Sequence, residues 1–290
     1  MKQLTDRVAI LTGASRGIGP VIANQLAEQG VHLVLVARSA DKLQREAERL
    51  STTYGIRTLP VTADLSDPST APGVVQSAIA EFGRVDILIN NAGGGGLGPF
   101  ADETPDAILD TLRLDLATPV LLTRAVLPQM QERGEGHIVH VSSIISKVDA
   151  KYVVSYAAAK AGLTHFSRSL RAELRGTGIS SSAVSPGMVG GAGMAQTWMD
   201  DSGIKPPKLM GSVSANQVAS AVLKAIRKDK AEVLVAPPGS KLMTLSPGFA
   251  SRMFGRIGAW EMMRKLSEGP TEPRPVQSAP TENPAENPAA

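Results

Sequence analysis

The chain has 290 residues, of which 42% are hydrophobic, 20% charged and 3% aromatic, as in a soluble globular protein with an aliphatic core. The sequence contains no cysteine, which excludes disulfides, thiolate catalysis and cysteine-ligated metal sites. Its net charge of +3 is too small and too scattered to indicate a nucleic-acid partner.

The amino-terminal stretch, residues 1–17, lacks the long apolar segment and small-residue cleavage site of a signal peptide. No segment approaches the roughly 18 apolar residues of a membrane span. We therefore expect a soluble, cytoplasmic protein. We also expect no metal site, because no metal-ligand spacing connects the four histidines, His32, His137, His140 and His165.

Short apolar runs alternate with longer amphipathic stretches over residues 1–240. Runs that are apolar throughout predict strands buried on both faces, and their alternation with helices predicts a parallel sheet covered on both sides. We expect one α/β domain, a Rossmann-type doubly wound sheet with one strand for each of these runs: RVAILTG, HLVLVAR, RTLPVTAD, VDILINNAG, GHIVHVSS, ISSSAVSPG and AEVLVAP. One of the intervening helices should span residues 105–131, after Thr104 and with Pro105 in its first turn.

The stretch LTGASRGIG, residues 11–19, joins the first predicted strand to the first predicted helix. Glycines in this pattern allow a tight turn, close approach of a phosphate and close packing of the helix on the sheet. The start of the helix then offers N–H groups and a positive dipole end to a pyrophosphate. A tight turn without a ligand is the alternative. We predict dinucleotide binding by Gly13, Ser15, Arg16, Gly17, Ile18 and Gly19.

The second predicted strand ends in LVLVARSADK, with no acidic residue at the strand end. An acid there would bind a ribose 2′-hydroxyl and repel a 2′-phosphate. Arg38 takes this position, and Arg16 lies in the glycine loop. Two guanidiniums favour a phosphate through charge-assisted hydrogen bonds, so we predict NADP(H) rather than NAD(H). The alternative for Arg38 is a surface charge neutralised by Asp41.

Four further motifs follow in a fixed order, Asn90-Asn91-Ala92-Gly93, Ser143, Tyr156-x-x-x-Lys160 and Pro186-Gly187. With these motifs and the glycine loop, the chain resembles the short-chain dehydrogenase/reductase family over about residues 5–237. The resemblance implies hydride transfer between a nicotinamide and a carbonyl or alcohol. It also implies a homodimer or homotetramer packed through helices 105–131 and 155–175.

Tyr156 and Lys160 are four residues apart and would share one helix face. A free phenol has a pKa of about 10, and a nearby ammonium lowers it by favouring the phenolate. An exposed helix pair is the alternative. The resemblance implies that Tyr156 protonates the carbonyl oxygen, that Ser143 hydrogen-bonds the same oxygen, and that Lys160 also holds the nicotinamide ribose. We interpret Tyr152 as a packing or substrate-wall residue.

The resemblance also assigns the remaining cofactor contacts. Asp64 and Leu65 would meet the adenine; Asn91, Ala92 and Gly93 would line the cofactor cleft; Pro186, Gly187 and Val189 would lie beside the nicotinamide.

Two positions depart from the family pattern. Asp115 replaces a catalytic asparagine, and Gly191 replaces a threonine that commonly contacts the nicotinamide amide. A carboxylate at position 115 would raise the pKa of Lys160 and add negative charge near the phenol, so we count Asp115 as a catalytic residue of a retuned proton relay. The departures also leave open an alternative, a catalytically impaired NADP-binding regulator or scaffold.

The glycines of residues 190–193 suggest a mobile substrate lid that extends to about Gly211. Its apolar side chains predict a small apolar carbonyl or alcohol substrate: Met194, Trp198, Met199 and Met210.

The carboxy-terminal part divides into an extension, residues 241–267, and a tail, residues 268–290. Within the extension, residues 247–266 predict an amphipathic helix with basic residues. That helix would cover the active site or a partner subunit, or alternatively lie on a membrane surface. A peripheral membrane protein whose main task is lipid attachment is therefore a third hypothesis. The tail is rich in proline and poor in large apolar side chains, which predicts disorder.

Overall fold

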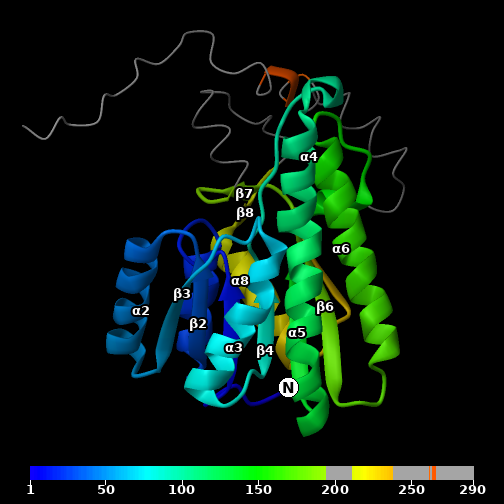
Figure 1. The fold of residues 1–290 in the computed structure, drawn as a ribbon. Helices are drawn as coiled ribbons and strands as arrows, with labels where there is room; N and C mark the ends of the chain where they lie inside the picture. Colours follow the sequence, from blue (N-terminus) through cyan, green and yellow to red (C-terminus); the bar gives the residue numbers. More distant parts are fainter. Residues whose placement is uncertain (194–210, 238–260, 262, 266–290) are drawn as a thin grey trace, which may run out of the picture.

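Seven parallel strands form the centre of the fold (Figure 1). The computed structural model describes residues 1–193, 211–237, 261 and 263–265. The strand order is β3-β2-β1-β4-β5-β6-β9. The strands are β1 (Val8–Thr12), β2 (His32–Ala37), β3 (Thr58–Thr62), β4 (Ile87–Asn90), β5 (Gly136–Val141), β6 (Ile179–Pro186) and β9 (Glu232–Val235). Each predicted run supplies one strand, so the predicted doubly wound parallel sheet is confirmed.

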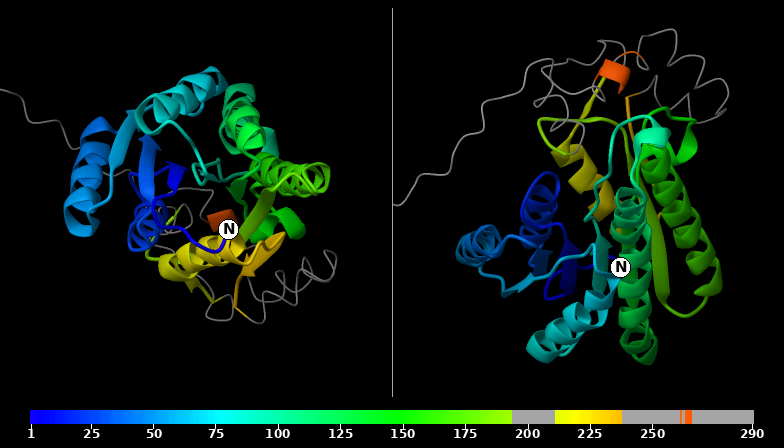
Figure 2. Two further views of the ribbon diagram at one scale, coloured as in Figure 1. Left: turned by 90° about the horizontal axis from the view of Figure 1, so that it is seen from below. Right: turned by 45° about the horizontal axis from the view of Figure 1, so that its top comes forward.

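Helices cover both faces of the sheet, as Figure 2 shows from below. One face carries α1 (Gly19–Ala27), α2 (Ala40–Tyr54) and α8 (Ala215–Arg227). The other carries α3 (Ala71–Phe82), α5 (Thr118–Arg133) and α6 (Val154–Glu173). The described part of the chain also contains shorter elements: the helices η1 (Pro68–Thr70), η2 (Phe100–Asp102), α4 (Pro105–Leu112) and η4 (Ile144–Lys147), and the parallel pair β7 (Val189–Gly190) and β8 (Val213–Ser214).

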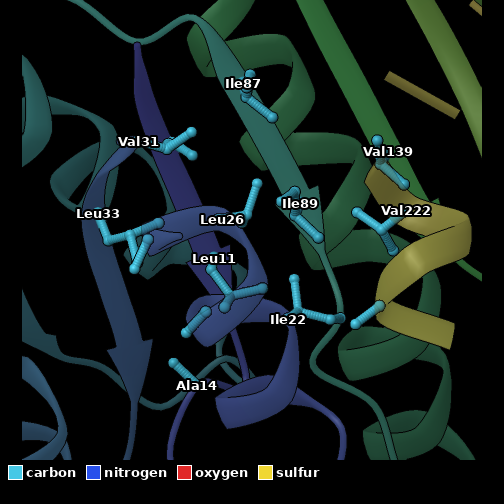
Figure 3. Packing of buried hydrophobic residues seen from close by; sticks show 14 of the residues in the cluster. Leu11, Ala14, Ile22, Leu26, Val31, Leu33, Ile87, Ile89, Val139 and Val222 are labelled. Carbon is cyan, nitrogen blue, oxygen red and sulfur yellow. The ribbon is translucent and has the colours of Figure 1, made fainter. Parts of the chain in front are cut away.

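Each face of the sheet has its own aliphatic core. Side chains alternate along a strand, so Leu11 of β1 packs toward Ile22 and Leu26 of α1 (Figure 3), whereas its neighbour Ile10 belongs to the opposite core. All four of these side chains are buried. Burying one Leu or Ile side chain stabilises a fold by roughly 1.5–3 kcal/mol, so the two cores fix the sheet between its helices.

The strand order reverses direction between β1 and β4. The register pairs Ile10 of β1 with Val34 of β2 on one side and with Leu88 of β4 on the other. The loops that leave β1 and β4 therefore diverge at the carboxyl edge, where doubly wound sheets hold their ligands.

The helix predicted over residues 105–131 is interrupted. Thr104 caps its start, accepting a hydrogen bond from the Ala107 N–H at 3.2 Å, as the sequence indicated. A π-helical segment, η3 (Arg113–Ala117), then separates α4 from α5. Pro119 has no N–H to donate to the carbonyl four residues earlier, that of Asp115, which accounts for the break in the α-helical pattern. Such π turns are frequent at functional sites.

Much of the predicted lid and carboxy-terminal part lies outside the described residues. This applies to the lid side chains of residues 194–210, to most of the extension 241–267 and to the tail 268–290. Of the extension, Glu261 and residues 263–265 are helical. Within the described parts of the chain, no helix is long and apolar enough to cross a membrane.

Candidate active site

A cavity of about 300 Å³ opens at the carboxyl edge of the sheet, beside the ends of β1, β2 and β3. Eight of its lining residues were predicted cofactor contacts: Gly13, Ser15, Arg16, Arg38, Asp64, Leu65, Ala92 and Gly93. The rest were not predicted: Ala37, Ser39, Lys42, Ala63, Ser66 and Leu114.

The glycine loop makes a cradle that other residues could not form. Gly13 has φ +69, and a β-carbon there would lie 2.9 Å from the Cα of Ala92. Gly17 has φ +66, a left-handed conformation that favours glycine. A β-carbon at Gly19 would overlap the carbonyl oxygen of Gly13. Ile18 precedes α1 without a side-chain cap, so the start of this helix borders the loop at which a pyrophosphate would bind.

Asn91 links the ends of β1 and β4 through hydrogen bonds. Its side-chain amide donates to the carbonyl of Thr12 at 2.9 Å, and its backbone N–H donates to the Thr12 hydroxyl at 2.9 Å. The same hydroxyl accepts from the N–H of Ala92 at 2.9 Å. Ala92 and Gly93 line the cavity, while Asn91 holds the turn that presents them.

Three cationic side chains surround one end of the cavity, Arg16, Arg38 and Lys42, and all are exposed. Ser39 precedes α2 with no side-chain cap hydrogen bond, which leaves its hydroxyl available to an anion. Within the part of the chain that the structure describes, no ion pair joins Arg38 to Asp41. Sequence reasoning missed Lys42, although its place in the first turn of α2, just after Arg38, was a usable signal.

Asp64 also lines this cavity. Hydrogen bonds from the backbone and hydroxyl of Ser66 lower the pKa of the Asp64 carboxyl, and the charge of Arg38 lowers it further. Asp64 is therefore an anion held in place by its own loop.

Tyr156 and Lys160 lie on α6, next to Ser143 at the end of β5. The exposed fractions are 9% for Tyr156, 3% for Lys160 and 8% for Ser143. The Lys160 ammonium is 5.7 Å from the centroid of the Tyr156 ring. Ser143 acts on the phenol to lower its pKa, and it starts η4, accepting a hydrogen bond from the Ile145 N–H at 3.2 Å. The structure thus brings together the three residues to which the family resemblance assigns proton transfer.

Ser142, which follows β5, contacts α6, the helix that also carries Tyr156. Its hydroxyl donates to the backbone carbonyl of Lys160 at 3.1 Å and lies 2.7 Å from the hydroxyl of Thr164. Ser142 therefore anchors the turn of α6 that carries Lys160.

Asp115 pairs directly with Lys160. The Lys160 ammonium lies 2.9 Å from the Oδ1 of Asp115 and donates to the carbonyl of Val141 at 3.0 Å. The Asp115 side chain is fully buried, and its Oδ2 accepts from the Gly94 N–H at 3.1 Å. The π-helical segment η3 thus delivers a carboxylate to the site.

The pKa values follow from burial and from this pair. Burial opposes the charged form of Lys160, but Asp115 and Tyr156 together raise the lysine pKa above its usual value. Burial raises the pKa of the Asp115 carboxyl, and the Lys160 charge opposes that rise. The Lys160 nitrogen and the Asp115 Oδ1 are in ion-pair contact, and each group favours the charged form of the other.

The pKa of the Tyr156 phenol differs from the prediction. Lys160 does act to lower the pKa of Tyr156, as does the hydrogen bond from Ser143. Burial outweighs both, and the charge of Asp115 acts in the same direction as burial, so the net pKa of Tyr156 is raised. The prediction considered the ammonium without the desolvation of the phenol.

Tyr152 contributes to the loop above the site. It has φ +67, which is uncommon for a bulky side chain, and its carbonyl accepts from the Gly98 N–H at 2.9 Å. This hydrogen bond joins the loop after β4 to the loop before α6.

The residues predicted beside the nicotinamide lie at the end of β6 and just after it, outside the cavity lining. The Gly187 N–H donates to the carbonyl of Val235 at 2.8 Å, and Val189, in β7, is buried. Pro186 ends β6. Gly191 has φ +71, so the threonine common in the family would be strained here.

Comparison with known proteins shows the family of this chain. The model of the short chain dehydrogenase family matches residues 7–203. Ketoacyl reductase HetN of Nostoc sp. is 35% identical over 277 residues, covering 92% of this chain and 95% of that protein. The chain belongs to the short chain dehydrogenase family. It is therefore an oxidoreductase of that family, as its motifs indicated.

Solved structures of the family agree in fold. A metagenomic short-chain oxidoreductase in complex with NADP superposes with a TM-score of 0.69 and 30% identity, covering 81% of this chain and 99% of that one. A variant of actinorhodin polyketide ketoreductase with NADPH gives a TM-score of 0.72 and 28% identity, covering 81% of this chain and 98% of that one.

Proposed function

We propose that this short chain dehydrogenase is an NADP(H)-dependent carbonyl reductase that reduces an apolar ketone. The observation that carries the proposal is the convergence of Ser143, Tyr156 and Lys160 at the carboxyl edge of the sheet, beside a glycine-lined cavity. In the reverse direction the same site would oxidise a secondary alcohol.

The residues of the cavity fit a dinucleotide phosphate. The glycine loop would hold the pyrophosphate, and Arg16, Arg38 and Lys42 would hold the 2′-phosphate. Lys160 would reach the nicotinamide ribose. A bound nicotinamide supplies or accepts the hydride of the reaction. The NADP and NADPH complexes of the related structures support this choice of cofactor.

The chain's own residues would manage the proton. Tyr156 donates its hydroxyl proton to the carbonyl oxygen of the substrate, and Ser143 donates a hydrogen bond to the same oxygen. Lys160 keeps a positive charge beside the phenol and stabilises the phenolate that forms. The burial of all three residues limits access of bulk water, which strengthens these interactions.

The substrate class rests on the relatives. One is named for a ketoacyl group and another for a polyketide, both of which present a ketone on an apolar chain. We infer that this chain acts on a substrate of that kind.

A direct experiment is to follow NADPH and NADH oxidation against a panel of apolar ketones with wild type and Tyr156→Phe. We expect wild type to turn over with NADPH, and the variant to lose at least a hundredfold in kcat, because general acid catalysis contributes roughly 10²–10⁴-fold. Turnover by Tyr156→Phe at the wild-type rate would contradict the proposal.

Asp115 favours a second function, because its Oδ1 lies 2.9 Å from the Lys160 ammonium and pairs with it. A site whose lysine is held in this way could bind NADP(H) and act as a regulator or scaffold. NADPH binding without turnover on the whole ketone panel would favour this second function.

A further inference from the structure

Asp115 places a second charged group, a carboxylate, in the proton-transfer site. This charge affects the pH at which Tyr156 loses its hydroxyl proton. The inference rests on the proposed reductase function and concerns the pH range over which it operates. Its starting point is the contact between the Lys160 ammonium and the Asp115 carboxylate, both of which are buried.

The carboxylate is built into the site. The Gly94 N–H donates to its Oδ2 at 3.1 Å, and Lys160 lies 2.9 Å from its Oδ1. Gly93 packs against the carboxylate so closely that a β-carbon at this position would lie 2.5 Å from the Asp115 Oδ1. Contacts with residues 93 and 94 therefore hold Asp115 beside Lys160.

The charged and titratable neighbours of Tyr156 come from three elements. Lys160 lies on α6 and Asp115 on η3, and both act on the phenol; Ser143, just after β5, also lowers the pKa of Tyr156. His140 on β5 interacts with Lys160, but burial lowers its pKa to about 3, so it is neutral in the working range. The balance at the phenol is thus set by one cation and one anion.

Among the described residues, Lys160 is the cation that acts on Tyr156, and an anion beside it changes the charge balance when Tyr156 loses its proton. With Asp115 ionised, the pair with Lys160 is already neutral, and a phenolate would add an unbalanced negative charge in a buried place. Without the carboxylate, the phenolate would itself neutralise Lys160. The first case favours the protonated phenol.

We propose that Asp115 is a positioning residue that, by holding Lys160, keeps Tyr156 protonated into the alkaline range. The site then remains a proton donor for ketone reduction over that range. Alcohol oxidation needs the phenolate and is displaced to more alkaline conditions.

The first test needs no cofactor. Tyrosine labelled with ¹³C at Cζ gives one NMR resonance for each of Tyr54, Tyr152 and Tyr156, and Tyr156→Phe assigns the third. We expect this resonance to titrate at lower pH in Asp115→Asn than in wild type. Asp115→Ala, which removes the charge without offering an amide, should move it in the same direction.

The control is Asp110→Asn. Asp110 lies on α4 with a side chain that is 61% exposed, and it pairs with Arg113, away from the cavity lining. It should leave the titration of Tyr156 unchanged. An unchanged or higher titration pH in both Asp115 variants overturns the proposal, as does an equal shift in Asp110→Asn.

A second test compares pH–rate profiles. In Asp115→Asn, the alkaline limb of ketone reduction and the acidic limb of alcohol oxidation should both move to lower pH, with a tenfold rate change for each unit of movement. If wild type reduces no ketone, the proposed function fails, and the NMR titration alone then decides whether Asp115 controls the phenol. If wild type is active and neither limb moves, the inference fails while the proposed function stands.

Discussion

Gly93 lies directly against Asp115, because a β-carbon at this glycine would be 2.5 Å from the carboxylate Oδ1 and 3.1 Å from the Lys160 ammonium. Gly93→Ala must therefore displace the ion pair or the loop. We expect kcat/KM for ketone reduction to fall by about a hundredfold, since a misplacement of about 1 Å in a catalytic group can cost that much. Steady-state kinetics with NADPH would measure the loss.

The matched control for this substitution is Gly96→Ala. A β-carbon at Gly96 meets nothing within 4 Å, and its backbone is not left-handed. Its kinetics should stay within about twofold of wild type. Equal losses in the two variants would mean that loop flexibility, and not the space beside Asp115, requires glycine.

Arg38 and Lys42 set the expected cofactor preference. Removing either side chain should raise the Kd for NADPH about tenfold or more and leave the Kd for NADH nearly unchanged, because a hydrogen bond to a charged group is worth roughly 1.5–3 kcal/mol. Fluorescence titration of Arg38→Ala and Lys42→Ala with both cofactors would measure this.

Arg45→Ala is the control for these two variants, since Arg45 is also exposed on α2 but does not line the cavity. A loss of NADH affinity equal to that of NADPH would contradict a role at the 2′-phosphate.

The sequence predicted the sheet because each buried strand reads as an uninterrupted apolar run, such as VAILT of β1. It also predicted the glycine loop and the Tyr156–Lys160 pair, which are local patterns of turn and helix. The contact of Gly93 with Asp115 was not accessible in this way, because it joins the end of β4 to a π-helical segment more than 20 residues later.

The raised pKa of Tyr156 was missed for a related reason. Desolvation of the phenol depends on packing from several elements, whereas the lysine four residues later is visible in the chain. Local spacing identified the charge but not the burial that outweighs it.

His137 should make the fold sensitive to acid. It is buried in β5, and its Nε2 lies 2.9 Å from the hydroxyl of Ser182, which itself donates to the carbonyl of Lys230. Burial lowers the pKa of His137 from 6.5 to about 4. The unfolded chain therefore binds a proton first as the pH falls, so stability is complete above pH 6.5 and declines toward about pH 4.

The shifted pKa of His137 should cost roughly 3 kcal/mol in free energy of unfolding, at about 1.4 kcal/mol for each pKa unit. Denaturant unfolding across this pH range would measure it, and His137→Gln should flatten the dependence. His165→Gln is the control, because His165 is exposed on α6 and its slope should match wild type. An identical slope in His137→Gln would assign the acid sensitivity to other groups.

Members of this family are typically oligomeric, and the outer helical layer of this chain carries the exposed apolar side chains that a subunit contact would bury. Leu109 on α4 is 45% exposed, Leu121 on α5 is 42% exposed, and Val154 on α6 is 43% exposed. Leu121 also borders a groove of about 400 Å³ between α3 and α5, together with Val75 and Ile79. We expect Leu121→Glu to weaken self-association, because burying an unpaired carboxylate is costly.

Light scattering on the purified protein would measure the mass of wild type and Leu121→Glu. Gln44→Glu, at an exposed position on α2 in the opposite helical layer, adds the same single negative charge and should keep the wild-type mass. A wild type that is monomeric at micromolar concentration would refute the expected assembly. If Leu121→Glu leaves the oligomer intact, the subunit contact lies on another face of the chain.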